Sequence, residues 1–369
     1  MSVVSIPAPE ALARLSEFDA VIDARSEGEF ELDRLPGAIN WPSLRNEERA
    51  RVGTLYKQVN PFEARKLGAA LVSRNIANHI EREAMDKPKG WRPLVYCWRG
   101  GQRSGALSLV LGQIGFRVHL IEGGYKAFRA AMLADLPACA ERLRYQVICG
   151  PTGSGKTRLL HALSEAGAQV LDLEGLASHR ASVLGLIPGK PQPTQKRFEM
   201  LLWETLCRFD PSRPVYVEAE SKKVGNVALP DALIQPMRTS PCLRVDLPED
   251  ERVALLLEDY PFFVSDPAFF CQRLDTLMTL RGRAVIDAWK TQVATGQTEA
   301  VVRELLEKHY DPGYATSTQR NFQQFGEALT VSLPDRSAAT LAHAAKTIME
   351  QTGAALPPPR SVVAGGSGI

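Results

Sequence analysis

Apolar residues along the chain gather in short runs, separated by stretches with helical spacing. In the first part of the chain, short runs occupy residues 20–22, 94–97 and 118–121. Residues 61–83 begin with a proline, which suits the first turn of a helix, and their apolar positions fall on one helical face. Short strands that alternate with amphipathic helices pack as a parallel sheet covered by helices. This part of the chain is therefore predicted to be a parallel α/β domain.

A second cycle of strands and helices begins at "YQVICG", and "AQVLDLEG", "RPVYVEAES" and "CLRVDLPE" supply three more predicted strands. Helical spacing returns at residues 284–308 and 338–351. The end of the chain, "PPPRSVVAGGSGI", is rich in Pro, Gly and Ser and cannot bury a core, which predicts disorder. We therefore predict an α/β protein with two parallel-sheet domains, residues 1–137 and 138–352, extra helices in the second, and a disordered tail at residues 353–369.

Composition narrows the class of protein. A length of 369 residues favours two or three domains. With 44 Lys and Arg against 42 Asp and Glu, the net charge is +2, so any nucleic-acid partner must be held by a local patch. The six cysteines show neither CxxC nor Cys/His ligand spacing, which predicts a reducing cytoplasm and no zinc site. The sequence shows no export signal and no run of ~20 apolar residues, so we expect a soluble, cytoplasmic protein without a membrane partner.

The stretch "VYCWRGGQRSG" places Cys97 between a predicted strand and a predicted helix. The thiolate is the reactive form of cysteine, and positive charge or aligned backbone amides stabilise it. A turn with two glycines can aim N–H groups at the sulfur, and the following helix offers its positive end. Such a loop suits a persulfide, a selenide adduct or a tetrahedral oxyanion. The candidate residues around Cys97 are Trp98, Arg99, Gly100, Gly101, Arg103 and Ser104.

Two other interpretations of this loop remain open on the residues alone. Cys97 could be a small buried apolar residue, with the glycines forming an ordinary turn between strand and helix. Alternatively, Cys97 and Arg103 have the C-x5-R spacing of cysteine phosphatases, in which the arginine grips phosphate with two hydrogen bonds. No second phosphatase signature is evident, and Trp98 offers a stacking surface rather than another donor for an anion.

The stretch "GPTGSGKT" matches the pattern G-x-x-x-x-G-K-[ST] at every position. A predicted strand precedes it and a predicted helix follows, which is the context that a phosphate-binding loop requires. Backbone amides would wrap a phosphate, the lysine would reach the outer phosphates, and the threonine hydroxyl is placed for a metal ion. The candidate phosphate-binding residues are Gly150, Gly153, Gly155, Lys156 and Thr157.

Polar residues near the predicted strand ends are further candidates, because sites gather at the carboxyl ends of parallel strands. Asp172 and Glu218 are the carboxylates available to organise Mg²⁺, although neither stretch is a strong signature of nucleotide hydrolysis. Glu220 could bind metal or position a substrate, or it caps the next element. His179 and Arg180 could line a substrate cleft, or they form solvated surface.

The surroundings of Cys97 resemble rhodanese domains, in "VIDARSEGEFELDRLPGAINWP" and "VHLIEGGYKAFRA". Those domains transfer sulfur or selenium through a cysteine at this loop position. Over about residues 12–350, the pieces "YCWRGGQRS", "EGGYKAFR", "GPTGSGKT", "LDLEGLASHRAS", "VYVEAES" and "YDPGY" resemble the tRNA 2-selenouridine synthase family. The resemblance implies an N-terminal rhodanese-like domain and a C-terminal P-loop NTPase-like domain.

The resemblance also implies a reaction. The substrate would be tRNA with 2-thiouridine at the wobble position, geranylated on sulfur by geranyl diphosphate and then given selenium from selenophosphate. Cys97 would carry the chalcogen, and the phosphate loop would bind geranyl diphosphate or a tRNA phosphate instead of ATP. We expect no tightly bound cofactor, no resident metal and no requirement for ATP, with Mg²⁺ as a candidate ion. The basic residues expected to form a tRNA patch are Lys196, Arg197, Lys222 and Lys223.

Two other functional classes use the same loops. A sulfur-relay protein with a regulatory nucleotide-binding domain would act on a small thiol acceptor and be indifferent to tRNA. A phosphatase joined to a kinase-like domain would release phosphate from aryl phosphates and phosphorylate an acceptor.

Overall fold

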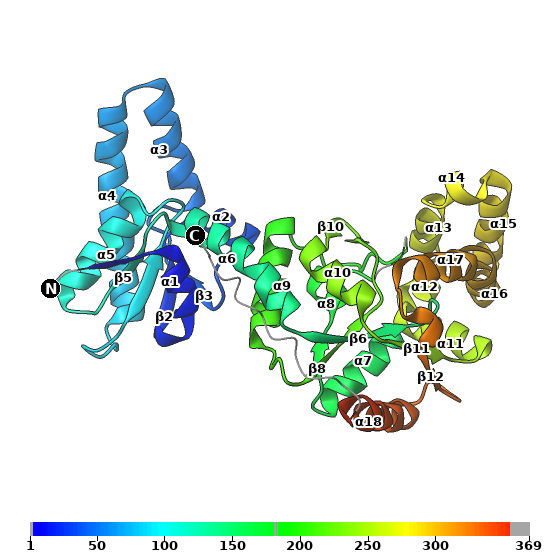
Figure 1. The fold of residues 1–369 in the computed structure, drawn as a ribbon. Helices are drawn as coiled ribbons and strands as arrows, with labels where there is room; N and C mark the ends of the chain where they lie inside the picture. Colours follow the sequence, from blue (N-terminus) through cyan, green and yellow to red (C-terminus); the bar gives the residue numbers. More distant parts are fainter. Residues whose placement is uncertain (1–2, 181, 183, 355–369) are drawn as a thin grey trace, which may run out of the picture. The chain divides into compact units, whose positions relative to one another are not determined.

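The computed structural model describes residues 3–180, 182 and 184–354, which divide into two compact units (Figure 1). The first unit contains the chain up to Pro137 and a later segment, Pro193–Glu204, and the second contains the rest. The sequence prediction assigned residues 193–204 to the second domain, and the structure corrects this. Their periodicity predicts a helix but carries no information about which core that helix packs against.

The first unit is built on a five-stranded sheet in the order β1-β5-β4-β2-β3, with all strands parallel. The three predicted strands are confirmed, while the two edge strands were not predicted because each contains exposed residues and a polar residue that interrupts its apolar run. The strands are β1 (Val4–Ile6), β2 (Ala20–Asp23), β3 (Ala38–Asn40), β4 (Pro93–Tyr96) and β5 (His119–Ile121).

Helices surround this sheet, and two of them, α3 and α4, lie side by side and extend away from it (Figure 1). The predicted helix at residues 61–83 is confirmed as α4 and the π-helical turn that continues it. The helical elements are α1 (Ala8–Ala13), a 3-10 turn (Leu15–Glu17), α2 (Glu27–Leu32), α3 (Asn46–Gln58), α4 (Pro61–His79), the π turn (Ile80–Ala84), α5 (Gln102–Ile114) and α6 (Gly124–Glu141).

The second unit has a five-stranded parallel sheet in the order β12-β11-β6-β8-β7 and a small antiparallel pair. The four predicted strands are confirmed. The edge strand β12 was not predicted, because its residues are mostly exposed and lack an apolar run. The strands are β6 (Arg144–Cys149), β7 (Gln169–Leu171), β8 (Pro214–Glu218), β9 (Lys223–Val224), β10 (Val227–Ala228), β11 (Cys242–Asp246) and β12 (Leu329–Ser332).

Helices cover the second sheet and extend beyond it. The single helical stretch predicted at residues 284–308 is two helices, since Gly296 adopts a positive φ of 80° that ends the first of them. The helices are α7 (Lys156–Glu165), α8 (Leu173–Ala177), α10 (Asp231–Thr239), α11 (Glu249–Asp259), α12 (Pro261–Ser265), α13 (Pro267–Asp275), α14 (Met278–Arg281), α15 (Arg283–Ala294), α16 (Thr298–Leu305), a π turn (Leu306–Tyr310), α17 (Asp311–Asn321), a 3-10 turn (Phe325–Glu327) and α18 (Ala338–Ala354). Helix α9 (Gln195–Arg208) belongs to the first unit up to Glu204 and to the second unit after it.

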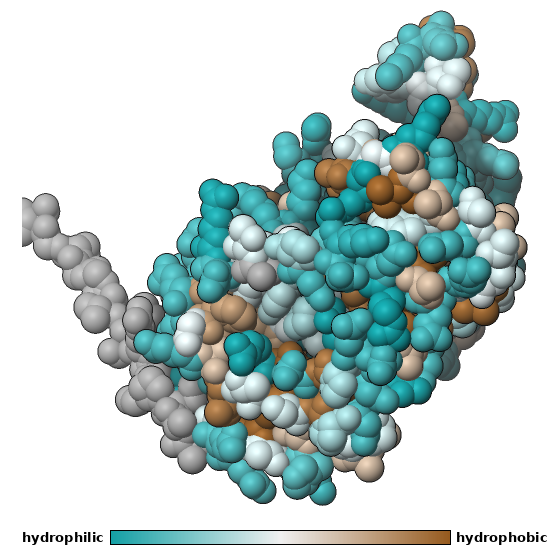
Figure 2. Space-filling view, turned by 90° about the vertical axis from the view of Figure 1, so that its right-hand side faces the viewer, coloured by the Kyte–Doolittle hydropathy of each residue, from teal (hydrophilic) through white to brown (hydrophobic). Residues whose placement is uncertain are grey.

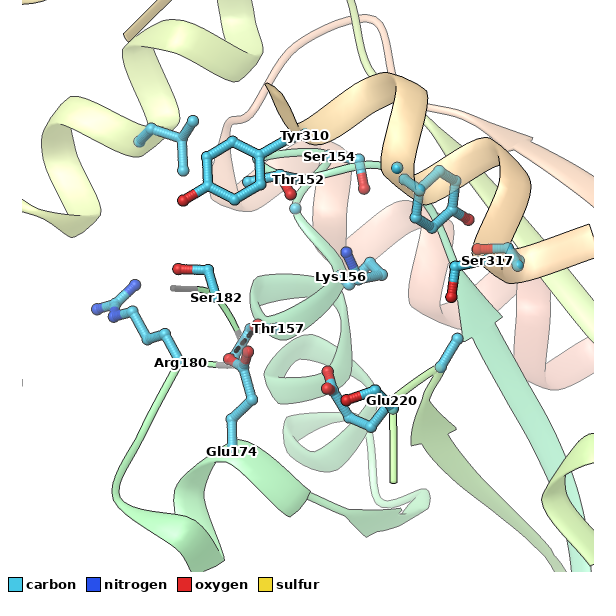
Figure 3. A pocket seen from close by; sticks show the side chains of 18 of the residues that line it. Thr152, Ser154, Lys156, Thr157, Glu174, Arg180, Ser182, Glu220, Tyr310 and Ser317 are labelled. Atoms are coloured by element: carbon cyan, nitrogen blue, oxygen red, sulfur yellow. Dashed lines mark hydrogen bonds between the residues drawn. The ribbon is translucent and has the colours of Figure 1, made fainter. Parts of the chain in front are cut away.

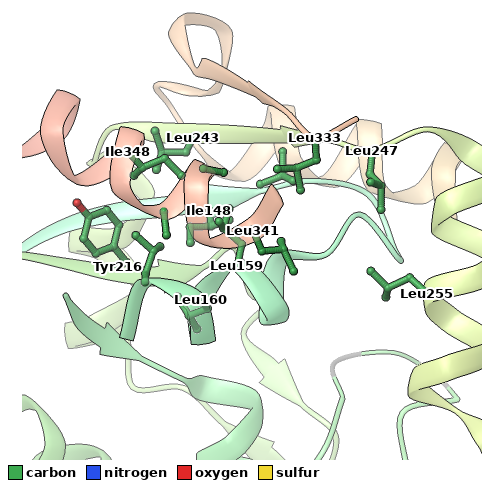
Figure 4. Close-up of a cluster of buried hydrophobic side chains, with 14 residues drawn as sticks. Ile148, Leu159, Leu160, Tyr216, Leu243, Leu247, Leu255, Leu333, Leu341 and Ile348 are labelled. Carbon is green, nitrogen blue, oxygen red and sulfur yellow. The ribbon is translucent and has the colours of Figure 1, made fainter. Parts of the chain in front are cut away.

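The core of the second unit lies between α7, α18 and the sheet (Figure 4). Ile148 of β6, Leu160 of α7 and Ile348 of α18 are almost fully buried there. This packing fixes the start of α7, where the phosphate loop ends. The tail predicted at residues 353–369 lies outside the described residues, except for Gly353 and Ala354, with which α18 ends.

Within the described part of the chain, no helix is long and apolar enough to cross a bilayer. The face drawn in Figure 2 is mostly hydrophilic, and apolar residues show there as separate patches.

Candidate active-site loops

Cys97 lies directly after β4, in the loop that leads to α5. Its side chain is only 3% exposed, and its Sγ accepts a hydrogen bond from Ser104 Oγ at 3.0 Å. Ser104 belongs to the first turn of α5, so the sulfur lies at the positive end of a thirteen-residue helix. The hydrogen bond therefore fixes the position of the sulfur at the start of α5.

The backbone of the cysteine loop is held by the segment that begins α6. Tyr125 N donates to Cys97 O at 2.8 Å, and Lys126 N donates to Trp98 O at 3.2 Å. A Cβ on Gly124 would lie 2.3 Å from Cys97 O, so only glycine allows this close approach. The segment "EGGYKAFR", which resembles the family's sequence, therefore stabilises the conformation of the loop that holds Cys97.

The two arginines of the loop differ in their surroundings. Arg103 Nη1 donates to Glu29 Oε2 at 2.7 Å, while Arg99 is exposed and has no ion-pair partner among the described residues. Burial raises the pKa of Glu29, but the hydrogen bond and charge of Arg103, with Arg49, outweigh burial and lower it. Arg99 is thus the guanidinium of this loop that is open to an incoming anion.

A stack of two rings between two cations lies beside the loop. The Arg25 guanidinium lies 4.2 Å from the centre of the Tyr125 ring, which stacks on Trp98 with 5.3 Å between centroids. Lys196 Nζ lies 5.7 Å from the centre of the Trp98 ring. These side chains line a pocket of about 360 Å³ in the first unit. Glu29 of α2 and Gln195 of α9 also line it.

Sequence reasoning missed most of this stack. Arg25 lies within the quoted "VIDARS" stretch and makes a buried pair with Asp23 at 2.6 Å. Lys196 was assigned to a tRNA patch, without a predicted contact to Trp98. Spacing along the chain does not reveal that contact, because it forms only when α9 returns to the first unit.

The phosphate loop has the expected place between β6 and α7. Gly153 and Gly155 have φ values of 77° and 86°, which few other residues adopt. Lys156 Nζ donates to Gly150 O at 2.7 Å, so its ammonium group lies over the loop. From α11, the buried Arg252 donates two hydrogen bonds to Thr152 O, at 3.0 and 2.8 Å, and pairs with Asp311 at 2.6 Å. The clamp from α11 was not predicted.

A cavity of about 410 Å³ surrounds the phosphate loop (Figure 3). Arg180 lines it and pairs with Asp259 at 3.3 Å. His179, predicted to share the cleft with Arg180, does not line this cavity and is buried instead. The remaining walls include Glu174, Ser182, Glu220, Tyr260, Tyr310 and Ser317.

A smaller apolar hollow shares residues with this cavity. The residues that line both are Thr152, Ser182, Leu256, Tyr260 and Tyr310. The hollow continues into aliphatic and aromatic side chains that do not line the cavity, namely Leu184, Phe263, Val302, Leu305 and Leu306. The space around the phosphate loop is therefore polar at one end and apolar at the other.

Three carboxylates gather at the polar end. Glu174, Glu218 and Glu220 place oxygens within 4.8 Å of one another, and Thr157 Oγ1 donates to Glu174 Oε2 at 3.3 Å. Burial and then the Glu174 charge raise the pKa of Glu218 to about 8, and the same causes raise the pKa of Glu220. Carboxylate and hydroxyl oxygens are the ligands that Mg²⁺ prefers, and a divalent cation would relieve this crowding. The donor set therefore fits Mg²⁺.

Asp172, the other predicted metal carboxylate, lies outside this group. Its Oδ1 accepts from Gly175 N at 2.7 Å and so caps α8. Glu174, two residues later in the same quoted stretch, takes the place among the carboxylates. The turn that separates the two was not visible in the apolar pattern.

The four residues of the predicted tRNA patch fall in both units. Lys196 and Arg197 belong to the first, and Lys222 and Lys223 to the second. Arg197 donates to Arg34 O at 3.2 Å and is half-buried, and burial followed by the charge of Arg34 lowers its pKa. Lys222 pairs with Asp231 at 2.8 Å.

Comparisons with known proteins match both parts of the chain. Residues 8–131 match the model of the rhodanese-like domain, and residues 143–268 match the model described as tRNA 2-selenouridine synthase AAA domain. The tRNA 2-selenouridine synthase of Aeromonas salmonicida is 32% identical over 339 residues, which cover 84% of this chain and 90% of that protein. The chain belongs to the tRNA 2-selenouridine synthase family.

Another member of the tRNA 2-selenouridine synthase family, from Nitrosomonas europaea, is 41% identical over 244 residues. That match covers 65% of this chain and 63% of the relative's length. Among solved structures, a rhodanese-related protein from Thermoplasma volcanium is 18% identical, with a TM-score of 0.23, over 34% of this chain and 89% of that one. The family and the α/β fold class predicted from the sequence are confirmed.

Proposed function

We propose that this chain converts wobble 2-thiouridine in tRNA to 2-selenouridine, by geranylation of the sulfur and replacement of the geranylated sulfur with selenium. One observation carries the proposal: a single chain of this family contains both a buried thiol in a glycine-rich loop and a phosphate loop whose cavity has an apolar side. Geranyl diphosphate and selenophosphate are the proposed donors, and ATP is not required.

The cavity at the phosphate loop suits geranyl diphosphate. The loop amides and Lys156 would hold the diphosphate, and the prenyl chain would lie within the larger cavity along its apolar wall, at Leu256 and Tyr260, because the hollow behind them has a volume of only about 30 Å³. The allylic C–O bond breaks with its electron pair on diphosphate, and the thiouridine sulfur forms the new C–S bond. Mg²⁺ held by Glu174, Glu218 and Glu220 would supply charge to the leaving diphosphate.

The cysteine loop suits the selenium step. We propose that the Cys97 thiolate adds to C2 of the geranylated base and expels geranyl thiolate. Selenium of selenophosphate then displaces the cysteine sulfur from C2, and water takes the phosphoryl group as inorganic phosphate. This order differs from the sequence expectation that Cys97 carries selenium, because moving selenium from selenophosphate onto a thiol would need an oxidant or release phosphite. Arg99 and the loop amides would hold selenophosphate, and two easier substitutions replace one difficult one.

Mass spectrometry of wobble nucleosides tests the proposal. In cells that lack this chain, the wild-type gene supplied back should restore 2-selenouridine. Lys156→Ala should leave 2-thiouridine, since geranylation fails, whereas Cys97→Ala should accumulate the S-geranyl nucleoside. Normal 2-selenouridine in the Cys97→Ala strain would contradict the role given to this residue.

A purified assay without nucleotide separates this proposal from an ATP-driven reaction. We expect full turnover with geranyl diphosphate, selenophosphate and 2-thiouridine tRNA alone. An absolute need for ATP would show that the phosphate loop serves another ligand.

A further inference from the structure

The hairpin formed by α3 and α4 has an exposed surface that the rest of the first unit does not cover. None of the thirteen residues of α3 is buried, although α4 buries four of its own. At the tip, Tyr56, Val59 and Phe62 are 51%, 71% and 63% exposed. Large apolar side chains gathered at an exposed tip are typical of an interaction site.

The hairpin also concentrates positive charge. Residues 46–79, which form the two helices, hold six basic and three acidic residues, a net charge of +3, whereas the whole chain carries +2. Arg49 and Lys66 pair with Glu29 and Glu63 at 3.3 and 2.7 Å. The other four basic side chains are exposed and make no ion pair within the described part of the chain: Arg51, Lys57, Arg65 and Arg74.

A groove runs from the hairpin to the start of α5, the helix that follows the cysteine loop. It has a volume of about 390 Å³ and is lined by Tyr56 of α3 and Arg65 of α4. At its other end, Gln102 and Arg103 begin α5, five and six residues after Cys97. An extended polyanion lying along this groove would run from the hairpin to the helix that follows the loop that holds the thiol.

We propose that the α3/α4 hairpin is the arm by which this chain grips the backbone of its tRNA next to the anticodon loop. The inference rests on the proposed function for the identity of the RNA. Unpaired Arg and Lys side chains neutralise phosphates and release counterions, and the exposed rings at the tip can stack on unpaired bases. We favour RNA over an anionic membrane as the partner of the hairpin, because the groove extends the binding surface toward the helix that follows the reactive cysteine.

Charge reversal at three unpaired positions tests this arm. The triple variant Arg51→Glu, Lys57→Glu and Arg65→Glu is compared with a control, Arg117→Glu, Arg283→Glu and Lys346→Glu, which changes the net charge equally at exposed sites elsewhere. The probe is fluorescently labelled tRNA with 2-thiouridine at the wobble position, titrated at several salt concentrations. Circular dichroism and thermal unfolding of both variants show whether they fold like the wild type.

We expect the hairpin variant to bind tRNA at least tenfold more weakly, with a salt slope reduced by about two to three from the loss of three phosphate contacts. The control should bind within about threefold of the wild type. Equal affinity and slope in wild type and hairpin variant would overturn the proposal. So would binding of phosphatidylglycerol vesicles that is as tight as tRNA binding and is lost in the same variant.

The measurement separates this inference from the proposed function. The titration records binding alone. If the wild type makes no selenouridine but the hairpin variant still loses tRNA affinity, the proposed role of the hairpin stands and the proposed reaction is wrong. A chain that makes selenouridine and binds tRNA equally well with the reversed hairpin would keep the reaction and refute the arm.

Discussion

Gly124 shows how one backbone position governs the cysteine loop. Its φ is 57°, and an added Cβ would meet Cys97 O at 2.3 Å. Gly37 has a similar φ of 66° but open space around the position of its Cβ, which makes it a matched control.

We expect Gly37→Ala to cost about 1 kcal/mol of unfolding free energy, since a left-handed conformation is unfavourable for alanine. Gly124→Ala should cost at least twice as much and should also change the rate at which iodoacetamide alkylates Cys97, because the loop must move to relieve the clash. Urea denaturation and mass spectrometry measure the two effects. Equal stability losses and unchanged alkylation would show that the close approach does not constrain the loop.

Glu218 makes the second unit sensitive to pH. Its pKa is raised by burial and by Glu174 to about 8, from an ordinary value of 4.5. Ionising a carboxyl with a raised pKa costs stability, so stability that is full below about pH 4.5 falls as the pH rises through about 8. The direction is opposite to that of a carboxylate held in an ion pair.

We expect the melting temperature of the wild type to fall between about pH 4.5 and about pH 8, and Glu218→Gln to reduce that fall. Glu165→Gln, at an exposed position of α7, is the control and should leave it unchanged. Adding Mg²⁺ near pH 9 should raise the melting temperature of the wild type more than that of Glu218→Gln. An identical pH profile for all three proteins would contradict the role of this buried carboxyl.

At the scale of elements, α11 holds the phosphate loop through hydrogen bonds from Arg252. Arg252 joins Thr152 O to Asp311 of α17, while the exposed Arg303 of α16 pairs with Glu249 and Asp250 at the start of α11. Both arginines hold the same helix, but only Arg252 touches the loop.

We expect Arg252→Met to weaken diphosphate binding about tenfold, equivalent to ~1.4 kcal/mol, because the loop loses two hydrogen bonds that fix Thr152. Arg303→Met should leave the affinity within about twofold, since exposed ion pairs contribute little. Calorimetry with inorganic diphosphate measures both. Similar losses in the two variants would mean that the clamp acts on the helix and not on the loop.

The elements also show which parts of the fold a sequence can predict. Long apolar runs such as that of β6 and long amphipathic stretches such as that of α4 were predicted, because burial alone determines their pattern. Short edge strands such as β3 were missed, since pairing with a neighbour and not burial makes them strands. Both chemical loops were found from their glycines and reactive side chains.

What sequence could not supply were partners distant in the chain. Glu29 neutralises Arg103 across 74 positions, and Arg252 reaches Thr152 across 100. The spacing of residues along the chain does not predict such contacts, because they form only when the chain has folded and its strands have paired in the sheet. For the same reason, Glu174 was passed over in favour of Asp172.

For the whole molecule, a net charge of +2 conceals an uneven distribution. The α3/α4 hairpin carries more positive charge than the entire chain, so the remainder is net negative. A composition that gives no general attraction to nucleic acid is therefore compatible with a basic arm. The sequence prediction placed the tRNA-binding charge at two pairs of adjacent basic residues, Lys196 and Arg197, and Lys222 and Lys223. It overlooked the hairpin, whose basic residues are spread over 26 positions.

The return of residues 193–204 to the first unit affects how the protein can be made. As the chain leaves the ribosome, the first unit lacks the start of α9 until residue 204 has emerged, by which time the phosphate loop is already outside. The N-terminal unit is therefore complete only after part of the C-terminal unit has emerged, which departs from the usual order of one domain after another. A gene cut after codon 137 would yield an N-terminal fragment without Lys196, which lies over the Trp98 ring. Exchanging the two units between relatives by a cut at that codon would therefore separate residues that belong to one site.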